Sequence, residues 1–176
     1  MCALVLAAVA SLAMAACGQS DEQVIRDGVT KDLESVKQVD QSVLDDFTNS
    51  LTGTFDFTTY GITAEDFFKA WLSGFDYSVD TVTVNGSDAT VSVTITCKSM
   101  TAIMSAWQTA VLDWANTNEA QSMTQDQINQ KAGSMLMDAA NSTSTQTTSI
   151  NLPYTKNGNT WEPGSNFDNE LGKAIG

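Results

Sequence analysis

The segment 89–97 alternates strictly between apolar and hydroxyl-bearing residues. Because successive side chains of a β-strand point to opposite faces, this pattern predicts a strand with one buried face and one wet, hydroxyl-rich face. Asn85 and Gly86 precede it, and this dipeptide favours a tight turn. We therefore expect a hairpin with a first strand over 77–84. The apolar positions of the second strand are Ala89, Val91, Val93, Ile95 and Cys97.

The first strand changes phase between Val79 and Val82, which predicts a β-bulge near Asp80 or Thr81. A second hairpin follows much later in the chain. The Ser/Thr-rich tract 141–149 is expected to pass from loop into its first strand, in which residues 148–154 alternate, and its turn is expected at Lys156–Asn159. Thr160 and Trp161 open the returning strand, which Pro163 and Gly164 end.

Helical spacing of apolar residues predicts the remaining elements. Ser20 to Gln23 fits a helix-capping box before the first of them, and Thr124 to Gln127 fits another. A break at 116–122 separates two long helices. The expected helices cover 21–36, a segment after Asp40, 63–75, 100–114, 124–139 and 167–175.

The order is helices, hairpin, two helices, hairpin and a short helix. This order favours an α+β fold in which a four-stranded antiparallel sheet, made of two hairpins, is packed by helices on one side. The long helical segment between the two hairpins leaves the strand order open.

The first 16 residues are apolar and uncharged, and they end in Ala15-Ala16 directly before Cys17. A membrane-spanning helix needs about 20 residues, so the segment is the length of an export signal. Met14-Ala15-Ala16-Cys17 resembles the lipobox of bacterial lipoproteins. The resemblance implies removal of residues 1–16 and acylation of Cys17, which would hold the chain on the outer, extracytoplasmic face of the cell membrane. A retained N-terminal helix and a simple secreted form are the alternatives.

On this interpretation the chain has three parts. Residues 1–16 are a lipoprotein signal peptide, residues 17–20 are the lipidated cysteine with a short tether, and residues 21–176 are a single α+β domain. The tether from Gly18 to Ser20 reaches about 10 Å at 3.3–3.6 Å per residue. The domain would then sit close to the membrane.

Charge and composition exclude several functions. The chain carries 21 acidic and 8 basic residues, a net charge of −13. Nucleic-acid binding needs clusters of Lys and Arg, so we expect no nucleic-acid partner. The chain has no histidine, which excludes Ser-His-Asp and Cys-His catalysis and imidazole metal sites. We predict no enzymatic activity, no catalytic residue, no metal site and no cofactor.

The two hairpins support a further resemblance. The stretches Val82–Val91 and Tyr154–Trp161, together with the leading helices and the lipobox, are similar to small lipoproteins of Gram-positive bacteria with a cystatin-like or nuclear-transport-factor-like domain. That resemblance implies a cone-shaped α+β fold and supplies no catalytic residue.

Folds of this kind often leave an apolar cavity between sheet and helices. The first hypothesis is therefore a non-enzymatic module that binds a small apolar ligand or an envelope component. The alternative is a protein-interaction or envelope-assembly role, which an exposed apolar patch would favour. A stripe of methionines on the two long helices fits either core filling or an adaptable apolar groove. Candidate ligand-lining residues are Trp71, Tyr77, Trp107, Trp114 and Trp161.

Overall fold

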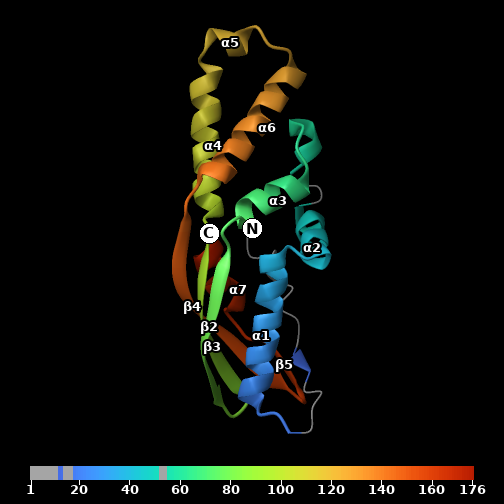
Figure 1. Ribbon diagram of the computed structural model, residues 1–176, viewed down its shortest axis with the longest axis vertical. Coiled ribbons are helices and arrows are strands. Elements are labelled where there is room, and N and C mark those ends of the chain that lie inside the picture. Colours follow the sequence, from blue (N-terminus) through green and yellow to red (C-terminus); the bar gives the residue numbers. More distant parts are fainter. Residues whose placement is uncertain (1–11, 14–17, 52–54) are drawn as a thin grey trace.

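An antiparallel sheet occupies one half of the molecule, and a helical hairpin projects from its end (Figure 1). The computed structural model describes residues 12–13, 18–51 and 55–176. The sheet has the order β1-β5-β4-β3-β2 with all neighbours antiparallel. Its strands are β1 (Leu12–Ala13), β2 (Asp76–Asn85), β3 (Asp88–Lys98), β4 (Thr145–Asn157) and β5 (Thr160–Pro163).

Strands β2 to β5 confirm the predicted four-stranded sheet, and both predicted turns are present. The predicted bulge is also confirmed, because the β2–β3 register shifts between Val79 and Thr81. At this bulge, the Nη1 of Arg26 on α1 donates a hydrogen bond to the carbonyl oxygen of Val79 at 2.7 Å. The bulge therefore gives the first helix a point of attachment.

Strand β4 begins earlier than the sequence pattern indicates. Residues 145–147 belong to the strand and pair with the end of β3, inside the tract 141–149 that we expected to pass from loop into strand. The sequence does not predict where in this tract the strand begins, because these residues are polar on both faces and show no alternation. Pairing stabilises them instead: the hydroxyls of Thr96 and Thr147 lie 2.8 Å apart, and those of Thr94 and Ser149 lie 3.0 Å apart.

Helices cover one face of the sheet. Helix α1 packs against β2 and helix α7 against β4, which confirms the predicted one-sided packing. The apolar side chains of the strands lie between the sheet and these helices. Val91, Val93 and Ile95 are among them and are fully buried. The helical elements are α1 (Asp21–Gln38), α2 (Gln41–Leu51), the 3₁₀ turn η2 (Phe57–Tyr60), α3 (Ala64–Leu72), α4 (Met100–Ala115), α5 (Asn118–Gln121), α6 (Gln125–Ser142) and α7 (Phe167–Ile175).

A buried lysine joins the sheet to the helical hairpin. The ammonium group of Lys98, the last residue of β3, donates hydrogen bonds to the carbonyl oxygens of Ala70 at 2.8 Å and Ala140 at 2.7 Å. Both carbonyls lie near the C-terminal ends of their helices, where a cation is favoured. Burial lowers the pKa of Lys98. The carbonyl of the same residue accepts a hydrogen bond from Trp71 Nε1 at 2.9 Å.

The two long helices of the hairpin begin where predicted, but α6 continues to Ser142, beyond the expected 139, and α5 lies in the predicted break at 116–122. Helix α4 continues directly from β3, capped by Ser99, whose hydroxyl accepts from the N–H of Ala102 at 3.1 Å. Helix α6 begins with the predicted capping box of Thr124 and Gln127. Figure 1 shows α5 at the far end of the molecule from the start of α1. The segment between the two β-hairpins is therefore an excursion beyond the sheet, and it leaves β3 and β4 adjacent.

The predicted lipidation site lies outside the described residues. Cys17 and most of the predicted signal peptide fall in the ranges 1–11 and 14–17. Leu12 and Ala13 are described, and they pair with Trp161 and Thr160 as a fifth, two-residue strand that we did not expect. Gly18 to Ser20 are exposed, and Ser20 caps α1 by accepting from the N–H of Gln23. No helix in the described part of the chain combines the length and apolar character of a membrane span.

Candidate functional site

Helix α4 exposes an apolar face to solvent. Most of its 16 residues are apolar, and Asp113 is its single charged residue. Two of them, Ile103 and Trp114, are buried. Met104 is 37% exposed and Leu112 is 58% exposed, which makes them the large apolar side chains most open to solvent among the described residues. An apolar helix that buries so little of itself is a candidate binding surface.

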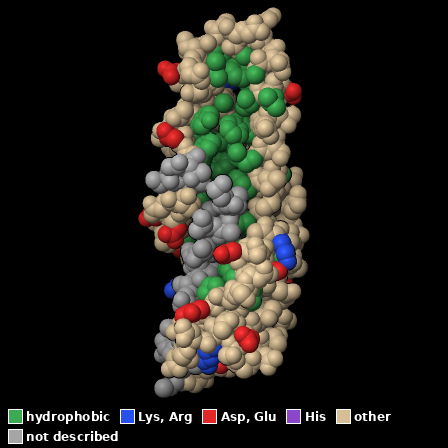
Figure 2. Space-filling model, turned by 180° about the vertical axis from the view of Figure 1, so that it is seen from behind, with side chains coloured by type: hydrophobic (Ala, Val, Ile, Leu, Met, Phe, Trp, Pro, Cys, Tyr) green, Lys and Arg blue, Asp and Glu red, His purple; other side chains and the backbone are tan. Residues whose placement is uncertain are grey.

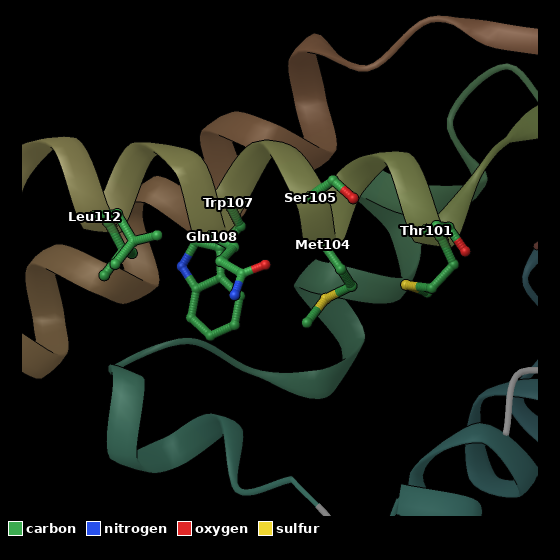
Figure 3. Close-up of a pocket in the computed structure, with 8 residues that line it drawn as sticks. Thr101, Met104, Ser105, Trp107, Gln108 and Leu112 are labelled. Atoms are coloured by element: carbon green, nitrogen blue, oxygen red, sulfur yellow. The ribbon is translucent and has the colours of Figure 1, made fainter.

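An open groove of about 560 Å³ runs along this face. Figure 3 shows Met104 and Trp107 projecting from one side of α4. We call this site the α4 groove, and its lining defines it. The lining residues are Met100, Thr101, Met104, Ser105, Trp107, Gln108, Val111 and Leu112.

Trp107 forms a fixed wall of the α4 groove. Its Nε1 donates a hydrogen bond to the carbonyl oxygen of Ala132 on α6 at 2.8 Å. Its ring meets Tyr60 edge-on at 5.8 Å and Phe55 at 6.2 Å between centroids. Phe55 and Tyr60 stack on each other at 5.1 Å. The hydrogen bond and the ring contacts fix the indole. A ligand that packs on it therefore loses little binding free energy to ordering of the Trp107 side chain.

The η2 turn, whose Tyr60 contacts Trp107, can lie close to α6 because α6 has a glycine at position 133. A β-carbon built on Gly133 would lie 2.0 Å from the carbonyl oxygen of Tyr60, a separation that no side chain tolerates. Asp56 caps the η2 turn, since its carboxylate accepts from the N–H and hydroxyl of Thr58. These hydrogen bonds, those from Thr58 first, lower the pKa of Asp56. The sequence pattern does not predict the contact between Gly133 and Tyr60.

The segments that build this end of the molecule are acidic. Residues 55–66 and 99–144, which build this end of the molecule, contain seven acids and one base in the sequence. Figure 2 shows acidic side chains on both sides of the apolar patch. The single base is Lys131 on α6. The acids are Asp56, Glu65, Asp66, Asp113, Glu119, Asp126 and Asp138.

The five predicted aromatic residues do not gather around one space. Trp107 lines the α4 groove, whereas Trp71 and Trp161 are buried at 1% and 0% exposure in the core. Trp114 is also buried, and its Nε1 donates to Glu119 at 3.3 Å. Tyr77 is half-buried on β2, with its hydroxyl 3.0 Å from Glu34 Oε2 on α1. These four residues hold elements together.

Sequence reasoning found part of the α4 groove. Met100 and Met104 belong to the methionine stripe for which an adaptable groove was one of two interpretations. Leu112 and Val111 were expected in the helix but carried no signal of exposure. Exposure depends on which face the neighbouring helix α6 covers, and a single helix pattern does not contain that information.

The described residues contain few groups suited to chemistry. In the ranges 12–13, 18–51 and 55–176, no three His, Cys, Asp or Glu side chains cluster in a way that could hold a metal ion. Cys97 is buried, its thiol donates to the carbonyl oxygen of Ala174, and burial raises its pKa to about 11. The adjacent acids Glu65 and Asp66 are exposed on α3, where Glu65 pairs with Lys69.

Comparisons with known proteins give one partial likeness. No family model matches the chain, and no curated protein matches it significantly. A crystal structure of "a putative lipoprotein (ycdA)" from Bacillus subtilis superposes with a TM-score of 0.44 and 16% identity. The superposition covers 86% of this chain and 47% of that protein, so this chain spans about half of its length.

Proposed function

We propose that this chain is a lipid-anchored, extracytoplasmic binding protein without enzymatic activity, and that it binds an apolar group in the α4 groove. The observation that carries the proposal is the uncovered apolar face of α4, with Met104 and Leu112 exposed beside a rigid Trp107. Apolar side chains that gather on an exposed surface are typical of binding sites, whereas single scattered ones need no explanation. The lipobox-like sequence ending at Cys17 supports the anchor.

The start of α1 and the helical hairpin lie at opposite ends of the molecule (Figure 1). Helix α1 starts three residues after the predicted tether begins, and Asp21 at its first turn pairs with Lys156 near the end of β4 at 2.8 Å. The hairpin formed by α4 and α6 points the other way (Figure 1). A lipid on Cys17 would therefore leave the α4 groove free to meet a ligand.

The anchor is tested by expression of the full chain in a bacterial host. We expect the protein in the membrane fraction, with an N-terminal peptide that begins at an acylated Cys17. The Cys17→Ser variant should leave the membrane fraction. A mature protein that retains Met1, or an unmodified Cys17, would contradict the anchor.

The groove is tested with residues 18–176. The buried apolar residues of the described chain fall between Val24 and Ile175, so this fragment keeps the core; cooperative thermal unfolding checks it first. We expect the neutral fluorophore N-phenyl-1-naphthylamine to bind. Leu112→Glu should weaken binding at least about tenfold, because a charge in the groove must lose water when the probe enters.

The matched control is Thr109→Glu, which adds the same charge to an exposed position of α4 outside the groove lining. It should bind the probe as the unmodified fragment does. Equal weakening by both variants would contradict a binding role for the α4 groove.

A further inference from the structure

The α4 groove has the geometry of a helix-binding surface. Its lining contains the row Met100, Met104, Gln108 and Leu112, in which each residue follows the last by four positions. Rows of this spacing form the ridges that interdigitate when two α-helices pack. The row covers twelve residue steps, which is about 18 Å at 1.5 Å per residue. That length matches three to four turns of a second helix.

The openness of the groove also favours a helix over a small molecule. Small-molecule sites enclose most of the ligand's surface. Here Leu112 keeps 58% of its surface and Met104 keeps 37%, so a small ligand would stay largely in water. A helix that lies along α4 would cover both residues together. Methionine suits this role because its flexible thioether adapts to varied apolar partners.

The negative charge near the groove favours a positively charged partner. The surrounding segments 55–66 and 99–144 carry seven acids and one base, and acidic side chains flank the apolar patch (Figure 2). Asp113 follows Leu112 directly on α4, and Asp56 follows Phe55, whose ring contacts Trp107. A second copy of this chain, with a net charge of −13, would be repelled from this surface. A cationic partner would be attracted.

We propose that the occupant of the α4 groove is a cationic amphipathic helix of a partner protein, with its apolar face on the Met100–Leu112 row and Lys or Arg residues toward the acidic rim. This inference rests on the proposed function, since it names the partner of the same groove. The docked helix would lie against α4 on the side of Trp107. Attraction between the rim and the basic flank would speed association and orient the helix.

The test uses residues 18–176 and two synthetic peptides of about 18 residues with the same apolar helical face. One peptide carries Lys on its polar face and the other carries Glu. We expect the Lys peptide to bind at least about tenfold more tightly than the Glu peptide at low salt, with the difference shrinking as salt screens the charges. Leu112→Glu should weaken binding of the Lys peptide less than it weakens the neutral fluorophore, because added negative charge attracts Lys.

A charge-neutralising variant tests the contribution of Asp113, which follows Leu112 on α4. Asp113→Asn should reduce the preference for the Lys peptide several-fold. The matched control, Asp88→Asn, removes the same charge from the first residue of β3, and it should leave the preference unchanged. An equal effect of both variants would show that net charge alone attracts the peptide, and it would overturn the proposed docking.

The remaining outcomes separate this inference from the proposed function. If the neutral fluorophore binds but the two peptides bind equally or not at all, the helix inference fails and an apolar binding site remains. If neither fluorophore nor peptide binds, both fail. A dimer of residues 18–176 in sedimentation that the fluorophore dissociates would make a second copy the occupant. Loss of Lys-peptide binding in the unprocessed full chain would make the apolar N-terminal segment the occupant; either result overturns the inference.

Discussion

Gly133 of α6 packs directly on the backbone of Tyr60, so that a β-carbon on Gly133 would lie 2.0 Å from the Tyr60 carbonyl oxygen and 2.9 Å from its carbon. The backbone at Tyr60 must therefore move if any side chain is added. We expect Gly133→Ala to lower the free energy of unfolding by about 1–3 kcal/mol, the range for an overpacked core. Urea unfolding followed by circular dichroism measures it.

The control is Gly172→Ala in α7, where a β-carbon would meet nothing within 4 Å. This variant should match the unmodified chain or gain about 0.5–1 kcal/mol from improved helix propensity. If Gly133→Ala were as stable as Gly172→Ala, the close contact between α6 and η2 would not exist in solution. Because Tyr60 also touches Trp107, the loss should be accompanied by a change in tryptophan fluorescence.

Lys98→Met tests the junction between sheet and hairpin. The substitution keeps the length of the side chain but leaves the carbonyls of Ala70 and Ala140 without their donor. Since a buried acceptor without a partner costs about 1–3 kcal/mol, we expect a loss of roughly 2–4 kcal/mol in thermal or urea unfolding. Lys69→Met removes an exposed lysine paired with Glu65 and should change stability by less than about 1 kcal/mol. Similar losses in both variants would contradict a structural role for Lys98.

Tyr77 makes the stability of the fold depend on alkaline pH. Burial, followed by the hydrogen bond to Glu34, raises its pKa from 10.0 to about 12. Between these values the unfolded chain releases the phenolic proton while the folded chain keeps it, so stability falls as pH rises from 10 to 12. Tyr77→Phe should show a smaller decline over that window in urea unfolding. An identical decline in the variant would assign it to other groups, such as Tyr154, whose pKa burial also raises.

The thiol of Cys97 should be inert in the folded chain. Residues 18–176 contain Cys97 as their one cysteine, it is 1% exposed, and its pKa is raised to about 11 by burial. Reaction requires the thiolate and access to it, and both are missing near neutral pH. We expect a chromogenic disulfide reagent to label no thiol under native conditions and one in guanidinium chloride. Rapid labelling of the native fragment would mean that α7 does not cover β3 as described.

The elements that the sequence predicts best are those with a strong local period. The alternation through Val91, Val93 and Ile95 fixes both the strand and its buried face, and the phase change after Val79 marks the bulge. The first residue of β4 is not predicted within the tract 141–149, for the converse reason. Thr145 and Thr147 have polar neighbours on both faces, so their strand conformation comes from pairing with β3, which is close in space and distant in sequence.

In the candidate site, too, the local pattern predicts the helix but not the contacts made by residues distant in sequence. The helix that carries Met104 and Trp107 is predicted from spacing, and the methionines give a weak sign of a groove. The environment of Trp107 depends on Tyr60, Ala132 and the absence of a side chain at Gly133, contacts between segments that no local pattern connects. Large aromatic residues alone do not distinguish a wall of a groove from a core residue: Trp71 and Trp161 were candidates on equal terms and are buried.

Strand β3 continues directly into α4, so the two elements together set how far the α4 groove lies from the turn that precedes β3. Strand β3 has 11 residues and α4 has 16, so at about 3.3 Å and 1.5 Å per residue the two together extend about 60 Å away from the turn that precedes β3. If the proposed lipid on Cys17 holds the start of α1 near the membrane, the sheet and α4 would hold the groove away from the membrane surface. Partners rooted in the same membrane would need an extramembrane part of similar height to reach the groove, whereas diffusing proteins, or those on a facing surface, would meet it first.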